Sequence, residues 1–515
     1  MAGALTLPEG TAVVCIGFMG AGKSTAARSA AQALGIDCVD VDRVIEQRAG
    51  KPISAIFADE GEAAFRAAEE RITLELLRSP QARVLALGGG AISSAAVRAA
   101  LGAHLVIWLD IDLDTAWERA RDTGRPLARD RDRFAQLYAE REPIYAALAN
   151  ATVPGARSTG MRPLLAALAG VPPDTTLLWA TSASGDYAAF IANGLLARHR
   201  FWPAAITGRR FLVTDGRVGG LYGGLIEPLE GRVAIMPGEQ SKTVAHAEIV
   251  WTELARAGMT RQDLVVALGG GVVGDLAGFC AATYQRGVRY VQVPTTLVAQ
   301  VDSAYGGKTG VDLAEAKNYV GAFHQPAAVL VDTGLLASLP EPELAAGYAE
   351  IVKTALIAGG GLWERVRGGA APADEQVIVA CARTKLRIVA QDERDQGLRQ
   401  VLNLGHTVAH AIETTTGYAR YRHGEAVGLG LLAALRLSGQ DELRQEVAEL
   451  LRRQGLPTVL DGADPDAVVM ATARDKKRLG EGPVPFVLLQ TPGDPRPGCT
   501  VQARDLIAAV RELAA

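Results

Sequence analysis

The sequence predicts an α/β protein in two halves, with a helical region toward its C-terminal end. Three observations carry this prediction. A short apolar segment at 13–16 runs into a glycine-rich loop and then a helix-compatible segment, the order of a strand, a loop and a helix. From 175 onward, strand-like apolar segments alternate with helical stretches, which indicates a second sheet covered by helices. After Pro340 the pattern turns helical.

Length, charge and cysteine content restrict the class of protein. At 515 residues the chain is too long for one core, and domain sizes favour about three or four domains. Its 53 basic and 57 acidic side chains give a net charge of -4, so we expect no nucleic-acid partner. The 5 cysteines form no C-x-x-C pair, which fits a reducing cytoplasm. No apolar run approaches the ~20 residues of a membrane span, and the N-terminus lacks a signal-peptide pattern. We therefore expect a soluble, cytoplasmic protein without a membrane partner.

The loop after the first strand indicates phosphate binding. Residues 17–25 read Gly-Phe-Met-Gly-Ala-Gly-Lys-Ser-Thr, the complete G-x-x-x-x-G-K-[ST] phosphate loop. Its glycines let backbone N–H groups wrap the phosphates of a nucleotide, Lys23 reaches the outer phosphates, and Ser24 can hold Mg²⁺. A chance glycine-rich turn is the alternative, and the strand–loop–helix setting argues against it.

Two aspartates follow the next strand. In Val39-Asp40-Val41-Asp42, strand alternation predicts that Asp40 and Asp42 lie on one face of the strand end. One carboxylate could act on the metal while the other accepts the proton of a substrate hydroxyl, as phosphoryl transfer to an alcohol needs. An aspartate that caps a helix at 43–48 is the commoner explanation for such a residue alone.

Four further motifs complete the first half. They are Gly61-Glu62-Ala-Ala-Phe65-Arg66-Ala-Ala-Glu69, the run Gly88-Gly89-Gly90 after a strand at 84–87, Arg125-Pro126, and Arg141-Glu-Pro143-Ile-Tyr145. Arg66 and Arg141 can supply forked guanidinium contacts to a carboxylate substrate. Either arginine alone would more often form a surface salt bridge. Residues 123–133 are charged and poorly periodic, as a solvated lid would be.

Together with the phosphate loop, these motifs resemble shikimate kinase. The resemblance implies a P-loop kinase domain with a nucleoside-monophosphate-kinase-like fold and a mobile lid, which uses ATP and Mg²⁺ to phosphorylate shikimate. It carries ATP binding onto Gly20, Ala21, Gly22, Lys23, Ser24 and Thr25, and Mg²⁺ binding onto Ser24 and Asp40. It carries shikimate binding onto Asp42, Arg66, Gly88, Gly89, Gly90 and Arg141, and catalytic roles onto Asp42, Lys23 and the lid residue Arg125.

The junction between the halves is short and stiff. Residues 161–169 can form a last helix of the first domain, and Gly170-Val-Pro-Pro-Asp174 then breaks the helical pattern. We expect a first domain at 1–170, a linker at 171–174, an α/β domain at 175–335 and a helical domain at 336–515.

The stretch 264–326 has the character of an active site. An apolar run at 264–268 ends in Gly269-Gly270-Gly271, so that a buried strand can deliver backbone amides to a phosphate. The G-x-G-x-x-G pattern there is weak, because the acidic residue of a Rossmann ribose contact is missing ~20 positions later. Cations and aspartates interleave downstream, which predicts a site for an anionic substrate beside a dinucleotide: Arg286, Lys308, Lys317, Asp275, Asp302 and Asp312.

Histidines cluster in the helical region. Three of the 7 histidines, His406, His410 and His423, fall close together, which favours a metal site over unrelated core histidines. Spacing alone favours His406 and His410 as a pair of metal ligands, because residues i and i+4 lie on the same face of a helix. Glu350 and Lys353 lie i,i+3 on a helix, where a surface ion pair is the usual explanation.

The second half resembles 3-dehydroquinate synthase. The motifs that carry the resemblance are Gly-Gly-Gly-Val-x-Gly-Asp, Tyr284-Gln-Arg286-Gly, Val293-Pro-Thr-Thr296, the run from Asp302 to Lys308, Asn403-Leu-Gly-His406-Thr and His423-Gly-Glu. The resemblance implies NAD⁺ and a divalent metal, usually Zn²⁺ or else Co²⁺, between an α/β nucleotide domain and a helical domain. It carries the metal ligands onto Glu350, His406 and His423, in place of the pairing of His406 with His410.

The same resemblance assigns roles to the remaining charged and polar residues. NAD⁺ contacts carry over to Asp215, Glu239, Lys242, Gly270, Gly271, Asp275, Thr295 and Thr296, with Lys308 and Lys317 beside the cofactor. Substrate contacts carry over to Arg286, Asp302, Lys308, Lys317, Asn318, Lys353, Lys385, Arg399, Asn403 and Lys477 of the pair 476–477. Catalytic roles carry over to Lys308, Lys353, His410 and Arg286. Asp312, Ala316 and Ala409 stand where the family usually has Asn, Gly and Gly.

The sequence thus predicts a bifunctional enzyme of the shikimate pathway. Its substrates would be shikimate, ATP and 3-deoxy-D-arabino-heptulosonate 7-phosphate, and the synthase half suggests a homodimer. Two alternatives stay open: the second half could be another sugar-phosphate cyclase, or one half could be an inactive binding or scaffolding module.

Overall fold

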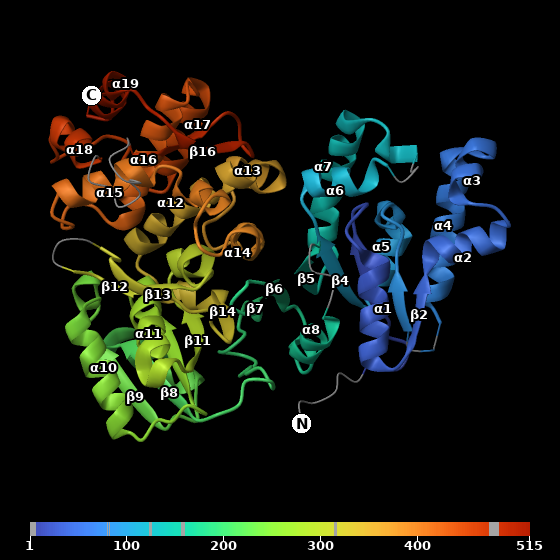
Figure 1. Ribbon diagram of the computed structural model, residues 1–515, viewed down its shortest axis with the longest axis horizontal. Helices are drawn as coiled ribbons and strands as arrows, with labels where there is room; N and C mark the ends of the chain where they lie inside the picture. The colour runs from blue at the N-terminus through green and yellow to red at the C-terminus, as the bar shows by residue number, and fades with distance from the viewer. Residues whose placement is uncertain are drawn as a thin grey trace. The chain divides into compact units, whose positions relative to one another are not determined.

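The computed structural model describes residues 7–79, 81, 83–122, 126–155, 160–313, 317–472 and 484–514. The chain forms two compact units (Figure 1). The first comprises Met1–Thr181, Ala188–Phe190 and Phe201–Thr207, and the second comprises Ser182–Tyr187, Ile191–Arg200 and Gly208–Ala515. Arg125 and Lys477, both predicted site residues, and Ala316 lie outside the described residues.

A parallel sheet forms the centre of the first unit, with its strands in the order β2-β3-β1-β4-β5-β6. Strand β1 is buried along its whole length, as expected of an apolar strand covered on both faces. The strands are β1 (Val13–Gly17), β2 (Asp37–Asp40), β3 (Arg83–Ala86), β4 (Leu105–Asp110), β5 (Ala151–Pro154) and β6 (Thr176–Ala180).

Helices cover this sheet, and α1 packs against β1 and β3. The α-helices are α1 (Lys23–Leu34), α2 (Val41–Ala49), α3 (Ile53–Asp59), α4 (Gly61–Leu77), α5 (Ala95–Leu101), α6 (Leu113–Ala120), α7 (Arg131–Leu148) and α8 (Met161–Leu168). Short 3-10 helices are η1 (Ala91–Ser93) and η2 (Pro126–Ala128). Strand β6, which sequence patterning assigned to the second half, pairs in parallel with β5 through Ala151 and Leu177. The domain limits at 170, 175 and 335 stay predictions.

The second unit contains a parallel arrangement of strands, in the order β14-β11-β10-β8-β9. Its register aligns Leu268 with Thr214 and Gly269 with Pro294, so three strands reach the same edge at their carboxyl ends. The strands of this part are β7 (Tyr187–Ala192), β8 (Arg210–Asp215), β9 (Gly231–Ile235), β10 (Leu264–Gly269), β11 (Arg289–Pro294), β12 (Lys308–Val311), β13 (Val320–Phe323) and β14 (Ala328–Asp332). β12 and β13 form a separate antiparallel pair.

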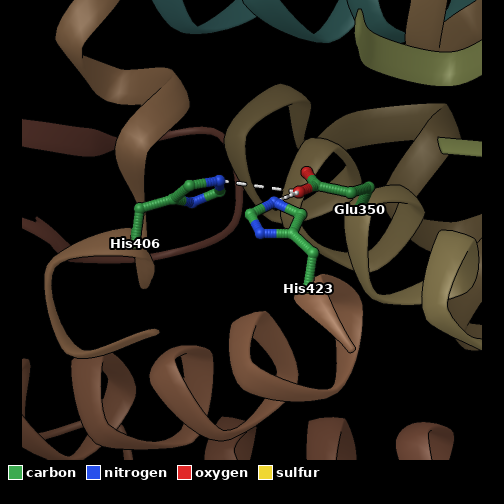
Figure 2. A group of neighbouring side chains, drawn as sticks. All are labelled: Glu350, His406 and His423. Carbon is green, nitrogen blue, oxygen red and sulfur yellow. Dashed lines mark hydrogen bonds and ion pairs between the residues drawn. The ribbon is translucent and has the colours of Figure 1, made fainter. Parts of the chain in front are cut away.

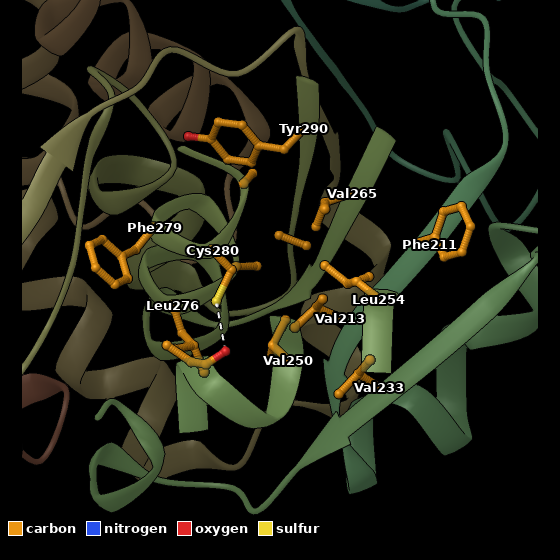
Figure 3. Close-up of a cluster of buried hydrophobic side chains, with 14 of the residues drawn as sticks. Phe211, Val213, Val233, Val250, Leu254, Val265, Leu276, Phe279, Cys280 and Tyr290 are labelled. Atoms are coloured by element: carbon orange, nitrogen blue, oxygen red, sulfur yellow. Dashed lines mark hydrogen bonds between the residues drawn. The ribbon is translucent and has the colours of Figure 1, made fainter. Parts of the chain in front are cut away.

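An apolar core holds this sheet against two helices. Figure 3 shows Phe211, Val213 and Val265 of the strands facing Val250 and Leu254 of one helix and the helix that carries Cys280. These two helices are α10 (Val244–Arg256) and α11 (Gly271–Thr283). The shorter helices here are α9 (Gly216–Tyr222), the 3-10 helices η4 (Gly223–Leu225), η5 (Glu239–Ser241), η6 (Tyr284–Arg286) and η8 (Thr333–Ser338), and the π-helix η7 (Ala299–Ser303).

The C-terminal part of the second unit is mainly helical, as predicted. Helix α12 packs against α16, and α15 packs against α16. The elements are α12 (Glu341–Ala358), α13 (Gly360–Arg367), α14 (Glu375–Gln391), η9 (Leu398–Asn403), α15 (His406–Thr415), α16 (His423–Leu437), α17 (Asp441–Arg453), α18 (Pro465–Thr472) and α19 (Ala503–Arg511), with an antiparallel pair β15 (Phe486–Leu489) and β16 (Pro495–Cys499). Within the described residues, no helix combines the length and apolar character needed to span a membrane.

Candidate active sites

The phosphate loop of the first unit has the predicted strand–loop–helix arrangement. β1 ends at Gly17, and α1 begins at Lys23. Gly20 and Gly22 have φ values of +79° and +87°, which favour glycine. A β-carbon at Gly17 would lie 2.6 Å from the Leu109 carbonyl oxygen, so the loop can lie this close to β4 only with glycine there. The Lys23 ammonium donates to the Phe18 carbonyl at 3.1 Å, which folds this cation over the loop.

Ser24 and Asp40 are brought together next to this loop. The Ser24 hydroxyl donates to the Asp40 carboxylate at 2.6 Å. A hydroxyl and a carboxylate oxygen side by side are a donor set that suits Mg²⁺, which takes oxygen ligands. Although Asp40 is the N-cap residue of α2, its side chain makes no capping hydrogen bond.

The predicted placement of Asp42 on the same strand face as Asp40 is wrong. β2 ends at Asp40, and α2 begins at Val41. The side-chain period therefore changes from two to 3.6 between the two aspartates, and Asp42 lies in the first turn of the helix.

Asp42 instead faces a buried charged group. A β-carbon at Gly88 would lie 2.8 Å from an oxygen of Asp42 and 2.2 Å from an oxygen of Glu69, so both carboxylates approach the Gly88 backbone. Glu69 is buried and forms an ion pair with Arg66 at 2.7 Å. Burial raises the pKa of the Glu69 carboxyl, and Arg66 offsets only part of that effect. A β-carbon at Gly90 would lie 2.0 Å from the Arg66 guanidinium, so these side chains leave no room for a side chain at Gly88 or Gly90.

The second predicted arginine contacts the middle glycine of the same run. Arg141, in α7, is buried and donates to the Gly89 carbonyl at 3.2 Å, and the Tyr145 hydroxyl donates to the same carbonyl at 2.6 Å. Burial lowers the pKa of the Arg141 guanidinium. The structure thus brings Asp42, Arg66, Arg141 and the three glycines to one site. Glu69 was missed as a site residue, although it falls one helical turn after Arg66.

In the second unit, the nucleotide residues gather at the carboxyl edge of the sheet. Asp215 ends β8, and its carboxylate accepts the Val218 backbone N–H at 2.8 Å, which caps α9. Gly270 lies between β10 and α11 and Gly271 begins α11, so their backbone N–H groups lie at a helix N-terminus. A β-carbon at Gly270 would lie 2.8 Å from Thr296, so the chain is packed closely here. Thr295 and Thr296 follow β11 at the same edge.

A buried lysine links the nucleotide residues. Lys242 forms an ion pair with Asp275 at 2.6 Å, lies 3.9 Å from Glu239, and donates to the Asn318 side chain. Burial alone would lower the pKa of Lys242, but these carboxylates raise it. Asp312, where the family usually has Asn, accepts the Asn318 backbone N–H at 2.6 Å and so fixes the turn that carries Asn318.

Two buried lysines converge on Asp302, which is carried by the π-helix η7. Lys353 of α12 lies 3.4 Å from the Asp302 carboxylate, and Lys385 of α14 donates to that carboxylate and to the Asp302 carbonyl. Burial alone would raise the pKa of Asp302, but the two ammonium groups outweigh it and hold that pKa at about 2. Burial lowers the pKa of Lys385. Lys353 also pairs with Glu350, and both are buried, so this i,i+3 pair is not a surface ion pair.

Glu350, His406 and His423 form a compact cluster of ligand atoms. One atom from each lies within 4.8 Å of the others. The His406 Nε2 lies 3.5 Å and the His423 Nε2 3.2 Å from the Glu350 Oε1, and both rings turn a nitrogen toward this carboxylate (Figure 2). Two imidazoles and a carboxylate are the ligand set of catalytic zinc sites with an open position. Sequence spacing alone suggested His406 and His410, at i and i+4, as a pair of metal ligands. The cluster among the described residues instead combines His406 with Glu350 and His423.

In both histidines, the Nδ1 atom, which is the nitrogen farther from Glu350, faces an oxygen atom. The His406 Nδ1 lies 3.2 Å from the Leu404 carbonyl oxygen, which can only accept, and so this nitrogen carries the proton. The His423 Nδ1 lies 3.4 Å from the Glu413 Oε1. Burial lowers the pKa of His406 to about 4, so its ring is neutral at pH 7. Oxygen partners at Nδ1 that leave Nε2 for a metal are typical of metal-binding histidines, so the cluster fits a divalent metal.

A cavity of about 1170 Å³ extends from the nucleotide residues to His423, the one member of the metal-ligand cluster among its lining residues. Asp215, Gly270, Thr296 and Lys242 line one part of it, and Asp302, Lys317, His410 and His423 line another. Its size suits a dinucleotide and a small substrate together. Glu239, Gly271, Asp275, Thr295 and Asn318 also line it. Glu413 lines it too and was not predicted.

Within the described part of the second unit, six predicted substrate residues are not among the residues that line this cavity. Two of them, Lys353 and Lys385, contact the lining residue Asp302, and the other four lie elsewhere among the described residues. Arg286 is exposed after the C-terminal end of α11, about 20 Å of helix away from Gly270. Lys308 is exposed and pairs with Asp395. Arg399 is buried and donates to the carbonyls of Glu393 and Gly306, at 2.6 and 3.0 Å. Asn403 is half-buried at the end of η9.

Comparisons with known proteins match a family to each half of the chain. The shikimate kinase family model matches residues 19–166, and the 3-dehydroquinate synthase N-terminal and C-terminal models match 232–346 and 347–478. The 3-dehydroquinate synthase of Symbiobacterium thermophilum is 43% identical over 334 residues, which is 60% of this chain and 92% of that protein.

Solved structures share the fold of the second half. One is ValA, a 2-epi-5-epi-valiolone synthase from Streptomyces hygroscopicus subsp. jinggangensis 5008 with NAD⁺ and Zn²⁺ bound, which is 28% identical with a TM-score of 0.59 and is covered over 99% of its length and 65% of this chain. A 2-deoxy-scyllo-inosose synthase complexed with carbaglucose-6-phosphate, NAD⁺ and Co²⁺ has the same fold at 24% identity and a TM-score of 0.59, with 100% of that chain and 65% of this one covered. The chain therefore belongs to the 3-dehydroquinate synthase family through its second half and carries a shikimate kinase domain in its first.

Proposed function

We propose that this chain is a bifunctional enzyme with two separate active sites. The first transfers the terminal phosphoryl group of ATP to a hydroxyl of shikimate, which gives shikimate 3-phosphate and ADP. The second converts 3-deoxy-D-arabino-heptulosonate 7-phosphate to 3-dehydroquinate and releases inorganic phosphate. The observation that carries the proposal is that each unit holds its own complete set of residue types: a phosphate loop beside a carboxylate and two arginines, and a metal-ligand cluster beside a cavity for a dinucleotide.

In the kinase site, the residues divide between phosphate and shikimate. Lys23 and the loop amides from Gly20 to Thr25 hold the ATP phosphates, and Ser24 and Asp40 hold Mg²⁺, which neutralises charge between the phosphates. Arg66 and Arg141 bind the shikimate carboxylate with forked contacts. Asp42 accepts the proton of the attacking hydroxyl. Arg125, outside the described residues, is proposed to reach the ATP phosphates from the lid.

In the synthase site, Asp215, Gly270, Thr295 and Thr296 bind NAD⁺ at the carboxyl edge of the sheet, with Gly271, Glu239, Lys242 and Asp275 beside them. Glu350, His406 and His423 hold the divalent metal. When bound, the metal supplies a Lewis acid that acidifies a substrate hydroxyl. NAD⁺, when bound, would supply a hydride acceptor that returns the hydride later in the same turnover, and the overall reaction would release phosphate and close the ring.

The cations of the synthase site bind the substrate anions. Asp302 lines the cavity, and Lys353 and Lys385, which pair with it, are proposed to supply positive charge for the substrate anions. Lys317 and Asn318 line the cavity on the side of the hairpin. His410 lines the cavity and is proposed to move a proton there. The substrate roles of Arg286, Lys308, Arg399, Asn403 and Lys477 rest on the family resemblance alone.

The second half could in principle be another sugar-phosphate cyclase, but its curated relative at 43% identity is a 3-dehydroquinate synthase. The test is incubation of the purified chain with 3-deoxy-D-arabino-heptulosonate 7-phosphate, NAD⁺ and Zn²⁺, and separately with shikimate, ATP and Mg²⁺. We expect inorganic phosphate and 3-dehydroquinate in the first reaction and ADP in the second. Absence of phosphate release would exclude the synthase, and absence of ADP would mean that the first unit is an inactive module.

Two further proposals concern the state of the enzyme in the cell. We propose a cytoplasmic enzyme, which the pathway substrates and the absence of paired cysteines support. We also propose a homodimer formed through the synthase half. Cell fractionation checks the first proposal, and sedimentation equilibrium, in which a mass near the 54.0 kDa of one chain would contradict a dimer, checks the second.

A further inference from the structure

Glu413 is a buried carboxylate beside the metal-ligand cluster, and the roles proposed above do not use it. It lies seven residues after His406 and three after His410 on α15, so these three side chains share one face of the helix. Its side chain is only 3% exposed. A charged carboxylate that is this deeply buried needs partners that compensate for the water it has lost.

Its two partners come from different parts of the second unit. The Glu413 Oε1 lies 3.4 Å from the His423 Nδ1 at the start of α16 and 3.4 Å from the Lys317 ammonium near the β12–β13 hairpin. Lys317 also lies 3.8 Å from Glu239 and sits over the Tyr418 ring, 4.4 Å from its centre. One oxygen atom of Glu413 thus faces a metal-ligand imidazole and a cation of the cavity.

The two ring nitrogens of His423 face two different carboxylates. Its Nε2 is 3.2 Å from Glu350, on the side of the metal-ligand cluster, while its Nδ1 faces Glu413 on the opposite side. An imidazole that binds a metal through one nitrogen carries a proton on the other, and an acceptor there fixes both the tautomer and the ring orientation. His406 has a backbone carbonyl in this place, and His423 has the Glu413 carboxylate at its Nδ1.

We propose that Glu413 is a positioning residue for both halves of the synthase site. It holds the proton on the His423 Nδ1, so that Nε2 is the ligating nitrogen, and it holds Lys317 at the cavity wall. The inference rests on the proposed metal role of Glu350, His406 and His423. Because one carboxylate serves both partners, the affinity for the metal and the position of the substrate-binding cation depend on the same side chain.

Glu413→Gln weakens both contacts with little change in shape, and Lys317→Met then separates the effect on the metal from the effect on the substrate. The amide lacks the negative charge and offers a weaker acceptor to two donors. We expect the Zn²⁺ affinity of the full chain, measured by competition with a chromogenic chelator, to fall by about 10- to 100-fold. Lys317→Met should leave the Zn²⁺ affinity unchanged while raising KM for the heptulosonate phosphate. Glu446→Gln, which alters an exposed carboxylate of α17, is the matched control and should change neither quantity.

A measurement on the unmodified chain makes the test independent of whether the variant folds. With ¹⁵N-labelled histidine and ¹¹³Cd²⁺ in the metal site, we expect cadmium–nitrogen coupling at the Nε2 of His423 and a proton on its Nδ1. Coupling at Nδ1 would overturn the proposal, and so would a Glu413→Gln protein that binds Zn²⁺ as tightly as the unmodified chain. If the unmodified chain binds no metal, the proposed metal site itself fails, which is a distinct result.

Discussion

At the scale of single residues, both sites depend on buried charges that hold one another in place. In the kinase site, Glu69 fixes Arg66 at 2.7 Å, and both lie against glycines that leave room for them. In the synthase site, Asp302 stands between Lys353 and Lys385. Removing one member of such a group leaves an uncompensated buried charge, so these positions tolerate substitution poorly.

Asp42 is the residue whose substitution tests the kinase chemistry most simply. Asn has nearly the same size and keeps the polar contact beside Gly88, but it cannot accept a proton. We expect Asp42→Asn to lower kcat for ADP formation by about 10²- to 10⁴-fold, with a smaller effect on KM for shikimate. The measurement is a coupled ADP assay. Asp59→Asn, in an exposed ion pair with Lys51, is the control and should keep full activity. Unchanged turnover of Asp42→Asn would mean that another group takes the proton.

The residue scale also shows where sequence patterns are sufficient and where they are not. The phosphate loop is local in sequence, so its glycines, Lys23 and Ser24 could be predicted directly. The position of Asp42 could not be predicted from alternation, because the helix begins one residue earlier. Glu413 shares a helix face with His406, which is a usable signal, but nothing in the spacing shows that His423 approaches that face. Only the packing of α15 on α16 brings them together.

At the scale of elements, the metal-ligand cluster depends on how closely α12 and α16 cross. Glu350 comes from α12, and His423 is the first residue of α16. A β-carbon at Gly424 would lie 1.8 Å from the Ala346 carbonyl oxygen, so only glycine permits this approach. The distance between two metal ligands is therefore set by a residue that binds nothing itself.

Gly424→Ala should push α16 away from α12 and displace His423 from Glu350. We expect Zn²⁺ affinity to fall by at least about 10-fold and the free energy of unfolding to fall by about 1–3 kcal/mol, as is typical of overpacking. Chelator competition and urea unfolding measure the two quantities. Gly428→Ala, on the same helix, is the matched control, because its β-carbon would meet only the Leu451 side chain at 3.4 Å. Equal metal affinities for the two variants would contradict this explanation.

The turn between α10 and β10 offers a stability test with a defined pH dependence. Asp263 accepts two hydrogen bonds from the Arg209 guanidinium, at 3.0 and 2.8 Å, and two from Thr260, at 2.7 and 2.8 Å. The Arg209 hydrogen bonds lower the pKa of Asp263 well below its ordinary value of 3.8. The ionised form is therefore favoured in the folded state.

Asp263→Asn should lower the free energy of unfolding by about 1–3 kcal/mol at neutral pH, because the charged hydrogen bonds are lost. The folded-state pKa is the lower one, so the unfolded chain binds this proton first as pH falls. The stability difference between the two proteins should be constant above the unfolded-state pKa of 3.8 and shrink below it. Urea unfolding between pH 7 and pH 3 measures it. A difference that grows as pH falls would contradict the assigned pKa direction.

At the scale of the whole molecule, the residues that we propose for each site come from one unit. The kinase residues lie in the first unit, and the NAD⁺ and metal residues lie in the second. The parallel sheets and the helical region followed from sequence patterning. The extension of the first sheet by β6 did not, because the pairing of a strand depends on its neighbours in space. The two activities should therefore be separable by substitution or by metal removal.

The most direct test of the central claim is phosphate release by metal-free enzyme. The full chain, dialysed against a chelator and then freed of it, is incubated with 3-deoxy-D-arabino-heptulosonate 7-phosphate and NAD⁺. ADP formation from shikimate, ATP and Mg²⁺ is measured on the same preparation. We expect no phosphate release until Zn²⁺ or Co²⁺ is added, and full kinase activity throughout. Phosphate release at the full rate without a divalent metal would contradict the assignment of Glu350, His406 and His423 as metal ligands of a synthase.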